Sequence, residues 1–132
     1  MAKSAIYTAN ATSTALTAGS AVPLGSTVRR FGSCLRQEGS SIALTAPGYY
    51  LVNASATLSP TAAGTVSITG QKDGVAVSGA TASVTTAAAA ASANLSLTFM
   101  VRNQCCDSSV LSFVLGDAAS TMTNFAVTVV KL

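Results

Sequence analysis

The chain of 132 residues contains no histidine and no tryptophan, and Glu38 is its only glutamate. Without histidine it has neither a Ser-His-Asp triad nor a Cys-His pair. No two carboxylates lie close together in the sequence, and no glycine-rich loop precedes a helical pattern to hold a phosphate. These absences exclude the common arrangements for acid–base, nucleophilic and phosphoryl-transfer chemistry. We therefore expect a protein that is not an enzyme.

Charge is also scarce: 8% of the residues are charged, against roughly 25% in ordinary soluble domains, and the net charge is +3. A nucleic-acid-binding protein would show a denser basic stripe with interleaved aromatic residues, so no nucleic-acid partner is expected. Arg29 and Arg30 are candidates for holding an acidic partner or the carboxylate of a glycan. The alternative is a solvated face, or ion pairs with Glu38 and Asp117.

Three cysteines, Cys34, Cys105 and Cys106, give an odd count that is typical of reduced thiols in an intracellular chain. A zinc site needs about four ligands, which this set does not supply, and no metal or cofactor is expected. Cys105 and Cys106 beside Arg102 are either a reactive pair or an incidental pair of loop thiols. The absence of a nearby base favours the incidental pair.

Long apolar runs are missing as well. The start, Met1-Ala2-Lys3-Ser4, lacks the apolar region of a secretory signal, and no stretch approaches the ~20 apolar residues of a membrane helix. We expect synthesis in the cytoplasm without a signal peptide, and no insertion into a membrane.

What the chain has in abundance is alanine, serine and threonine, which together make up nearly half of it. The clearest strand follows the corner at Pro47-Gly48, where apolar and polar side chains alternate through residue 58. This period of two points one set of side chains toward a core: Tyr50, Val52, Ala54, Ala56 and Leu58. The opposite set, which includes Tyr49 and Leu51, should face solvent or a partner.

Further strands are expected at residues 4–9, 27–35 (interrupted at Gly32), 41–46, 65–70, 94–102, 110–115 and 122–132. Asp73-Gly74 predicts a tight hairpin, with a return strand that ends near Gly79. Gln37 to Ser40 should form a turn, and residues 80–93 strand and loop. The 110–115 strand is apolar on both faces, so both should be covered. Eight to ten short antiparallel strands predict an all-β sandwich or barrel that forms a single domain over residues 1–132. Residues 1–20 would add a first strand and a flexible or docking segment.

These motifs resemble those of the C1q/TNF-like jelly-roll family. Pro47-Gly48-Tyr49-Tyr50 is similar to the "PGxY" strand of that family, and Lys72 to Val77 is similar to its "xxNGxxV" hairpin. The apolar 110–115 strand before Gly116-Asp117 and a terminal strand built on Phe125 follow in the family's order. The resemblance covers roughly residues 20–132 and is closest to the small Ala/Thr/Ser-rich versions of bacteria, prophages and phages.

The resemblance implies a ten-stranded jelly-roll β-sandwich that assembles as a trimer around a three-fold axis. The candidate residues at that axis are Tyr49, Leu51, Phe113, Leu115 and Phe125, and the alternative is that they form an ordinary monomer core. The family's acidic calcium-binding cluster is missing, because Asp73, Asp107 and Asp117 lie far apart in the sequence. A collagen-like stalk is missing as well.

Two classes of function follow. The first is a trimeric structural protein of a phage or prophage virion: a head fibre, decoration protein or fibre tip, exposed on the particle after cytoplasmic synthesis. Its partners would be copies of itself and other virion proteins. The second is a receptor- or glycan-binding module that recognises a host-surface glycan or protein. The lack of tryptophan and the small number of tyrosines favour the structural class.

Overall fold

The computed structural model describes residues 3–88, 91–104, 108–116 and 119–132, and it is built from β-strands alone. There are eleven, one more than the upper expectation: β1 (Ala5–Asn10), β2 (Thr14–Leu16), β3 (Ser26–Phe31), β4 (Leu35–Glu38), β5 (Ser41–Leu44), β6 (Gly48–Pro60), β7 (Gly64–Lys72), β8 (Val75–Thr86), β9 (Ala93–Asn103), β10 (Ser109–Gly116) and β11 (Ser120–Lys131). The described residues contain no helix long and apolar enough to cross a membrane.

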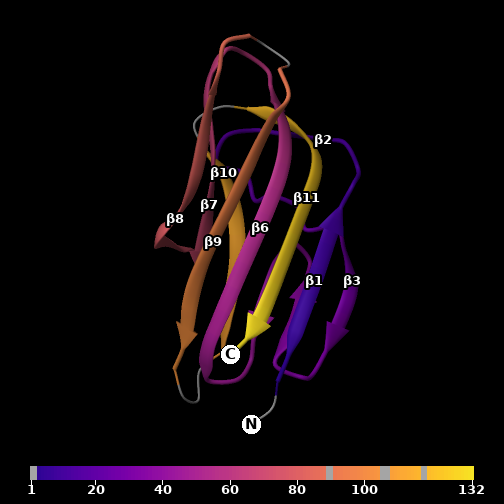
Figure 1. Ribbon diagram of the computed structural model, residues 1–132, viewed down its shortest axis with the longest axis vertical. Coiled ribbons are helices and arrows are strands. Elements are labelled where there is room, and N and C mark those ends of the chain that lie inside the picture. Colours follow the sequence, from indigo (N-terminus) through magenta and orange to yellow (C-terminus); the bar gives the residue numbers. More distant parts are fainter. Residues whose placement is uncertain (1–2, 89–90, 105–107, 117–118) are drawn as a thin grey trace.

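The strands form two antiparallel sheets that lie face to face (Figure 1). The front sheet has the order β3-β1-β11-β6-β9, and β2 pairs with the N-terminal end of β11. The back sheet has the order β4-β5-β10-β7-β8. The first and last strands of the chain are neighbours, and most connections cross between the sheets. The predicted jelly-roll sandwich is therefore confirmed.

The alternation in β6 sorts its side chains as predicted. The five residues expected toward the core are all buried, while Tyr49, Asn53 and Ser55 are exposed on the other face. The same pattern holds in β9 and β11, where Leu95, Leu97, Phe99, Val101, Phe125, Val127 and Val129 are buried. Sequence periodicity thus identifies which face of each front strand meets the back sheet.

Aromatic rings join the two sheets at the centre of the core. Phe113 of β10 meets Phe125 of β11 edge to face with 5.4 Å between ring centroids, and it meets Phe99 of β9 at 6.1 Å. Phe113, Leu115 and Phe125 are all 0% exposed. Their assignment to a trimer axis is therefore wrong: each points into the space between the sheets, where no second chain can reach it. Tyr49 and Leu51 stay available on the outer face.

The turns follow the predicted chemistry at the β7–β8 hairpin and differ elsewhere. Asp73 and Gly74 take positive φ values of 54° and 80°, as a tight hairpin requires. β8 then continues to Thr86 instead of ending near Gly79, because Gly79 absorbs a bulge with φ of 79°. Residues 37 and 38 belong to β4, so the predicted four-residue turn is reduced to Gly39 and Ser40.

The N-terminal segment is joined to the sandwich through β1, β2 and a few buried side chains. β1 lies between β3 and β11, and Leu16, Val22 and Leu24 are buried. The Val22 amide donates to the Phe113 carbonyl at 2.8 Å, so the segment beyond β2 extends the back sheet beside β10. The outer face of β10 is only partly covered, since Val110 is exposed, and the expectation that both faces are covered is wrong there.

Candidate interaction face

The outer face of the front sheet carries the two sequence candidates that remain accessible, Tyr49 and Leu51. Tyr49 is 44% exposed at the end of β6, and the Arg102 guanidinium lies over its ring, 5.8 Å from the ring centroid. Leu51 is half-buried and pairs with Met100 on one side and Val130 on the other. The pairing of residues between neighbouring strands shows which other side chains share this outer face with Tyr49 and Leu51.

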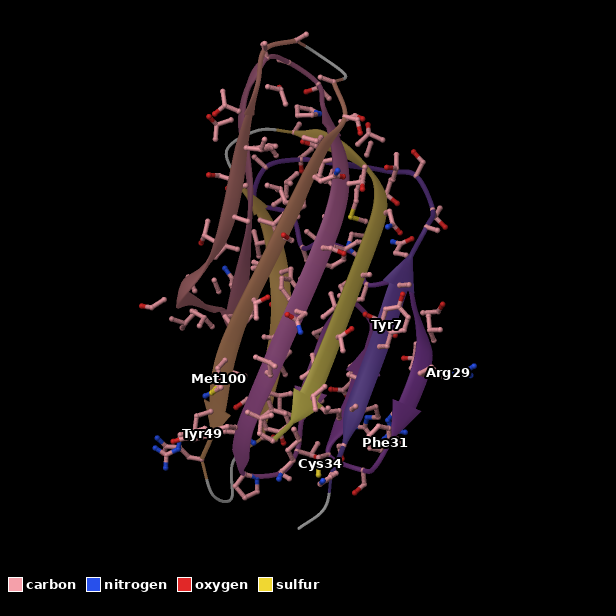
Figure 2. All side chains as sticks on the ribbon, viewed as in Figure 1. Tyr7, Arg29, Phe31, Cys34, Tyr49 and Met100 are labelled. Atoms are coloured by element: carbon pink, nitrogen blue, oxygen red, sulfur yellow. The ribbon has the colours of Figure 1, made fainter. Side chains whose placement is uncertain are left out.

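An apolar row crosses this face over five of the six strands of the front sheet. In register, Phe31 of β3 pairs with Ala5, Ala5 with Val130, Val130 with Leu51, and Leu51 with Met100. The two ends are the most exposed members: Phe31 is 61% and Met100 52% accessible. Figure 2 shows Phe31 and Met100 on opposite sides of the sheet, near the end where the chain terminates. We call these five residues the apolar row.

Beside the apolar row, the middle of the face is made of small polar side chains. Thr98 donates a hydrogen bond to the Asn53 amide oxygen at 2.6 Å, and the next pair is Ser55 with Ser96. These short side chains leave a shallow depression of about 370 Å³, lined by Tyr7, Asn53, Ala54, Ser55, Ser96, Leu97, Thr98, Ala126 and Thr128. The shortness of the side chains allows another backbone to approach this sheet closely.

The strands of the front sheet contain no Asp and no Glu. Arg29 on β3 and Arg102 on β9 are the charged side chains at its two edges, separated by uncharged rows. A charge-poor apolar centre with a polar surround is the composition of a protein–protein contact.

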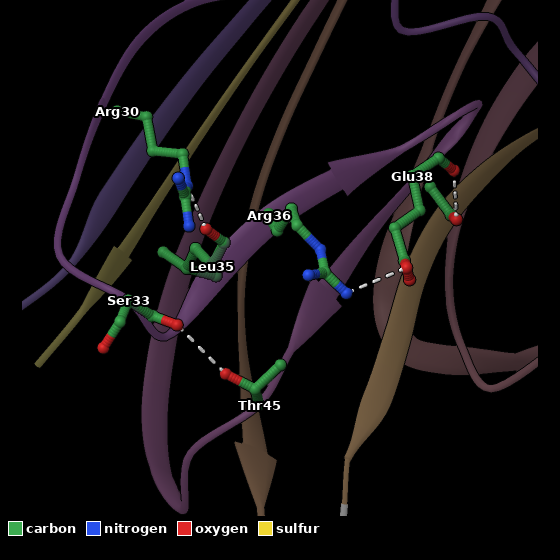
Figure 3. A network of polar contacts seen from close by, with 7 residues as sticks. Arg30, Ser33, Leu35, Arg36, Glu38 and Thr45 are labelled. Carbon is green, nitrogen blue, oxygen red and sulfur yellow. Dashed lines mark hydrogen bonds and ion pairs between the residues drawn. The ribbon is translucent and has the colours of Figure 1, made fainter.

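Arg29 and Arg30 alternate along β3 and have different environments. Arg30 Nε donates to the Leu35 carbonyl at 2.6 Å, which ties β3 to β4 across the edge of the sandwich (Figure 3). Arg29 has no hydrogen-bond or ion-pair partner among the described residues. The alternative in which these arginines pair with Glu38 is wrong, because Glu38 pairs with Arg36 at 3.1 Å. Asp117, the other expected partner, lies outside the described residues.

Tyr50 and Cys34 are ionisable groups inside the sandwich, and their role is structural. The Tyr50 hydroxyl donates to the Ala46 carbonyl at 2.6 Å, and burial raises the pKa of Tyr50, although this hydrogen bond opposes the rise. Cys34 is a buried free thiol. The other two cysteines, Cys105 and Cys106, lie outside the described residues, as does Asp107. Within the described ranges no three Cys, Asp or Glu side chains come together as metal ligands.

Phe31, Val130 and Met100 are members of the face that sequence reasoning missed. The alternation in residues 94–102 placed Met100 on the side away from the core, so a signal existed for it. The alternation in residues 122–132 likewise placed Val130 opposite Phe125, Val127 and Val129. No local pattern marked Phe31, because its place in the apolar row follows from pairing between distant segments.

No protein-family model matches the chain, and no curated protein matches its sequence. Solved structures do match its shape. Murine APRIL aligns with a TM-score of 0.77 at 14% identity, over 98% of this chain and 99% of that one. The globular domain of zebrafish complement 1qA aligns at 0.71 and 10% identity over 97% and 95% of the two chains. The phage PRD1 vertex protein P5 aligns at 0.65 and 15% identity over 98% and 96%.

The chain has the C1q/TNF-like jelly-roll fold. The alignments span nearly the whole length of each chain, so the N-terminal strand and the closing strand belong to the shared architecture. At identities of 10% to 15%, the agreement lies in topology and not in side chains. The resemblance read from the corner at Pro47-Gly48 and the hairpin at Asp73-Gly74 is confirmed at the level of fold.

Proposed function

We propose that the protein is a non-enzymatic homotrimeric structural module of a phage or prophage virion, such as a head fibre, decoration or fibre-tip protein. The observation that carries the proposal is the apolar row on the outer face of the front sheet. A monomer would leave Phe31, Leu51 and Met100 in water along one continuous line. Contiguous apolar surface of this kind marks a protein contact.

The dimensions of the face suit such a contact. Five strands spaced about 4.8 Å apart give a width of about 20 Å, and the 13 residues of β6 give a length of about 40 Å. The product, about 800 Å², equals the area that one partner contributes to a standard stable interface. The absence of acidic residues from these strands removes the cost of desolvating carboxylates.

A closed three-fold ring also needs a second, different surface on each copy, because its contacts are heterologous. β8 supplies a suitable one. It is the edge strand of the back sheet and carries no charged residue from Val75 to Thr86. Natural proteins protect exposed edge strands with charges or proline, and β8 has neither. β9, the edge strand of the front sheet with Met100, contacts β8 and lies on the same side of the sandwich.

The virion assignment is supported by two features. The phage PRD1 vertex protein P5 shares this fold over nearly the full length of both chains. The Ala/Ser/Thr-rich composition resembles the small phage and prophage versions of the family. The lack of histidine supports a role without catalysis.

The test is to place a charge in the apolar row. Leu51→Asp would put a carboxylate at the centre of the contact, and we expect sedimentation velocity to show the trimer replaced by monomer. The matched control is Ser112→Asp, which adds the same charge at a half-buried outer position of β10, the central strand of the back sheet. It should remain trimeric. Circular dichroism would verify that both variants are folded, and a folded Leu51→Asp variant that stays trimeric would contradict the assigned face.

A glycan- or receptor-binding role is the second candidate. It is favoured by one observation: Arg29, which has no hydrogen-bond or ion-pair partner among the described residues, lies beside the exposed rings of Tyr7 and Phe31.

A further inference from the structure

The lysines and arginines of this chain gather toward one end of the sandwich, the end at which N and C are marked in Figure 1. Every cation in the strands of the front sheet stands in a cross-strand row that meets β6 within its first six residues. In the back sheet, Arg36 and Lys72 lie in the rows of Val110 and Leu111, near the start of β10. The opposite half of the sandwich carries neither Lys nor Arg among the described residues.

Three of these cations surround one turn, the connection between β3 and β4. Lys3 precedes β1, Arg30 is the last residue but one of β3, and Arg36 is the second residue of β4. All three are exposed. Arg30 pairs with the buried Ile6, so its side chain lies on the side of β3 that faces β4, away from the outer front face. We call Lys3, Arg30 and Arg36 the basic cluster.

The turn that carries the basic cluster is fixed by hydrogen bonds. The Cys34 amide donates to the Ser4 hydroxyl at 3.1 Å. The Thr45 amide donates to the Cys34 carbonyl at 3.0 Å, and its hydroxyl to the Ser33 carbonyl at 3.2 Å (Figure 3). Gly32 has a φ of 80°, and a side chain there would collide with Ser4. A turn fixed in this way presents its cations with little further loss of backbone entropy on binding.

The guanidinium groups of the basic cluster keep free donors. Arg30 gives its Nε–H to the Leu35 carbonyl, and Arg36 gives one N–H to Glu38 (Figure 3). Each guanidinium has five donors, so both retain capacity for an anion. The Arg36–Glu38 pair has side-chain exposures of 61% and 49%, so it holds Arg36 only weakly.

The basic cluster stays accessible in the proposed trimer. β3 and β4 form one edge of the sandwich, and β8 and β9 form the opposite edge. The trimer contact uses the outer front face and the β8 edge. Because a three-fold axis places equivalent points of three copies at one height, the three basic clusters lie in one plane. Three cations against Glu38 alone give a net charge of +2 in this part of each copy.

We propose that the basic clusters bind a carboxylate-rich surface of another protein, to which the trimer attaches by this end. The inference rests on the proposed function and names the chemistry of its partner. A planar guanidinium matches a carboxylate with two parallel hydrogen bonds. Protection of a sheet edge does not account for the charges, because β8 is an edge strand of the same sandwich and has none.

An acidic protein fits the basic cluster better than a nucleic acid or a membrane. Single-stranded nucleic acids bind along a basic track with aromatic platforms, and membrane surfaces bind cations that are accompanied by inserting apolar side chains. Phe31 is the aromatic residue next to Arg30 in the sequence, and it lies on the other face of β3, in the apolar row. The basic cluster itself therefore offers charge and hydrogen-bond donors without an apolar anchor.

The experiment measures binding of the full chain to immobilised poly-L-glutamate by surface plasmon resonance, with poly-L-glutamine as the neutral control. Oligothymidylate and vesicles of phosphatidylcholine with phosphatidylglycerol present phosphate instead of carboxylate. We expect poly-L-glutamate to bind most tightly and poly-L-glutamine not to bind. Affinity for poly-L-glutamate should fall steeply as salt is raised, because the contacts are exposed.

Three variants locate the site. Arg36→Ala should weaken binding about 10-fold, because the trimer loses three exposed contacts at once. Glu38→Gln removes the acid that competes for Arg36 and should strengthen binding about 3-fold, a gain that unfolding would not produce. Lys72→Ala removes an equal charge at the end of β7 and should leave the affinity unchanged.

Three results would overturn the proposal: no binding of poly-L-glutamate at low salt, tighter binding of oligothymidylate or the vesicles, or equal losses in Arg36→Ala and Lys72→Ala. The mass in solution separates this proposal from the trimer itself. Arg36→Ala should remain trimeric. A monomeric unmodified chain would contradict the proposed function, and the comparison of Arg36→Ala with Lys72→Ala would still decide whether the basic cluster binds carboxylates.

Discussion

The two outer faces of the sandwich are built from the same residue types and behave differently. On the back sheet, threonines satisfy one another across strands: Thr65 with Thr85 at 2.9 Å and Thr69 with Thr81 at 3.1 Å. On the front sheet, Leu51, Val130 and Met100 line up in register beside small polar side chains. The threonines of the back face pair with one another and are suited to contact with water. The apolar side chains of the front face are exposed in the single chain. The two faces have similar overall composition. What distinguishes a solvated face from a contact face is the identity of the residues that pair across neighbouring strands.

The largest effect should come from the core that both faces enclose. Phe125→Ala removes a ring that is 0% exposed and packs on Phe113, so we expect a loss of about 3–5 kcal/mol in the free energy of unfolding. Denaturant titration of the Leu51→Asp background measures this without the contribution of assembly. A loss below about 1 kcal/mol there would return Phe125 to an interface role.

A smaller effect concerns pH. The pKa of Tyr50 is raised from 10.0 mainly by burial, which disfavours the phenolate. Its contribution to stability is therefore fully present below about pH 10 and is lost as the pH rises through the folded-state pKa. Tyr50→Phe should cost about 1 kcal/mol at pH 7 through the lost bond to Ala46.

The measurement for Tyr50 is the free energy of unfolding of both proteins from pH 8 to 11. The difference between them should shrink above pH 10 as the wild-type protein loses stability. A constant difference over this range would show that the buried hydroxyl does not titrate with folding.

The smallest effect is expected on the back face. Thr69→Val removes a hydroxyl pair at a strand position that favours β-branched residues, so stability should change by less than about 0.5 kcal/mol. Sedimentation should show unchanged assembly. A large change in assembly would mean that the contact proposed for the β8 edge extends over the outer face of the back sheet, which would remove the contrast between the two faces.

Local patterns predicted much of this fold. The alternation of apolar and polar residues predicted which side chains of β6, β9 and β11 face the core and which face outward. Asp73-Gly74 predicted the hairpin, because those residues accept positive φ. Sequence patterns could not distinguish residues of the hydrophobic core from residues of a contact between chains. Phe113 and Phe125 are as apolar as any interface residue, and only the meeting of two sheets shows that they face each other.

The candidate interaction face was harder to predict from the sequence than the fold, because it depends on pairing between strands that are far apart in the chain. The apolar row draws on β3, β1, β11, β6 and β9, which are scattered from residue 5 to residue 131. Register between distant strands is set by the whole fold, so no window of sequence contains it. The same holds for Arg29, whose place beside Tyr7 follows from the pairing of β3 with β1.

The central claim is that the front face is covered by other copies of the chain, and the mass of the protein in solution tests it most directly. Light scattering on a gel-filtration column, repeated over a range of concentrations, should give three times the chain mass of 13.0 kDa. A mass of 13.0 kDa at every concentration would contradict the account and leave the apolar row exposed to solvent.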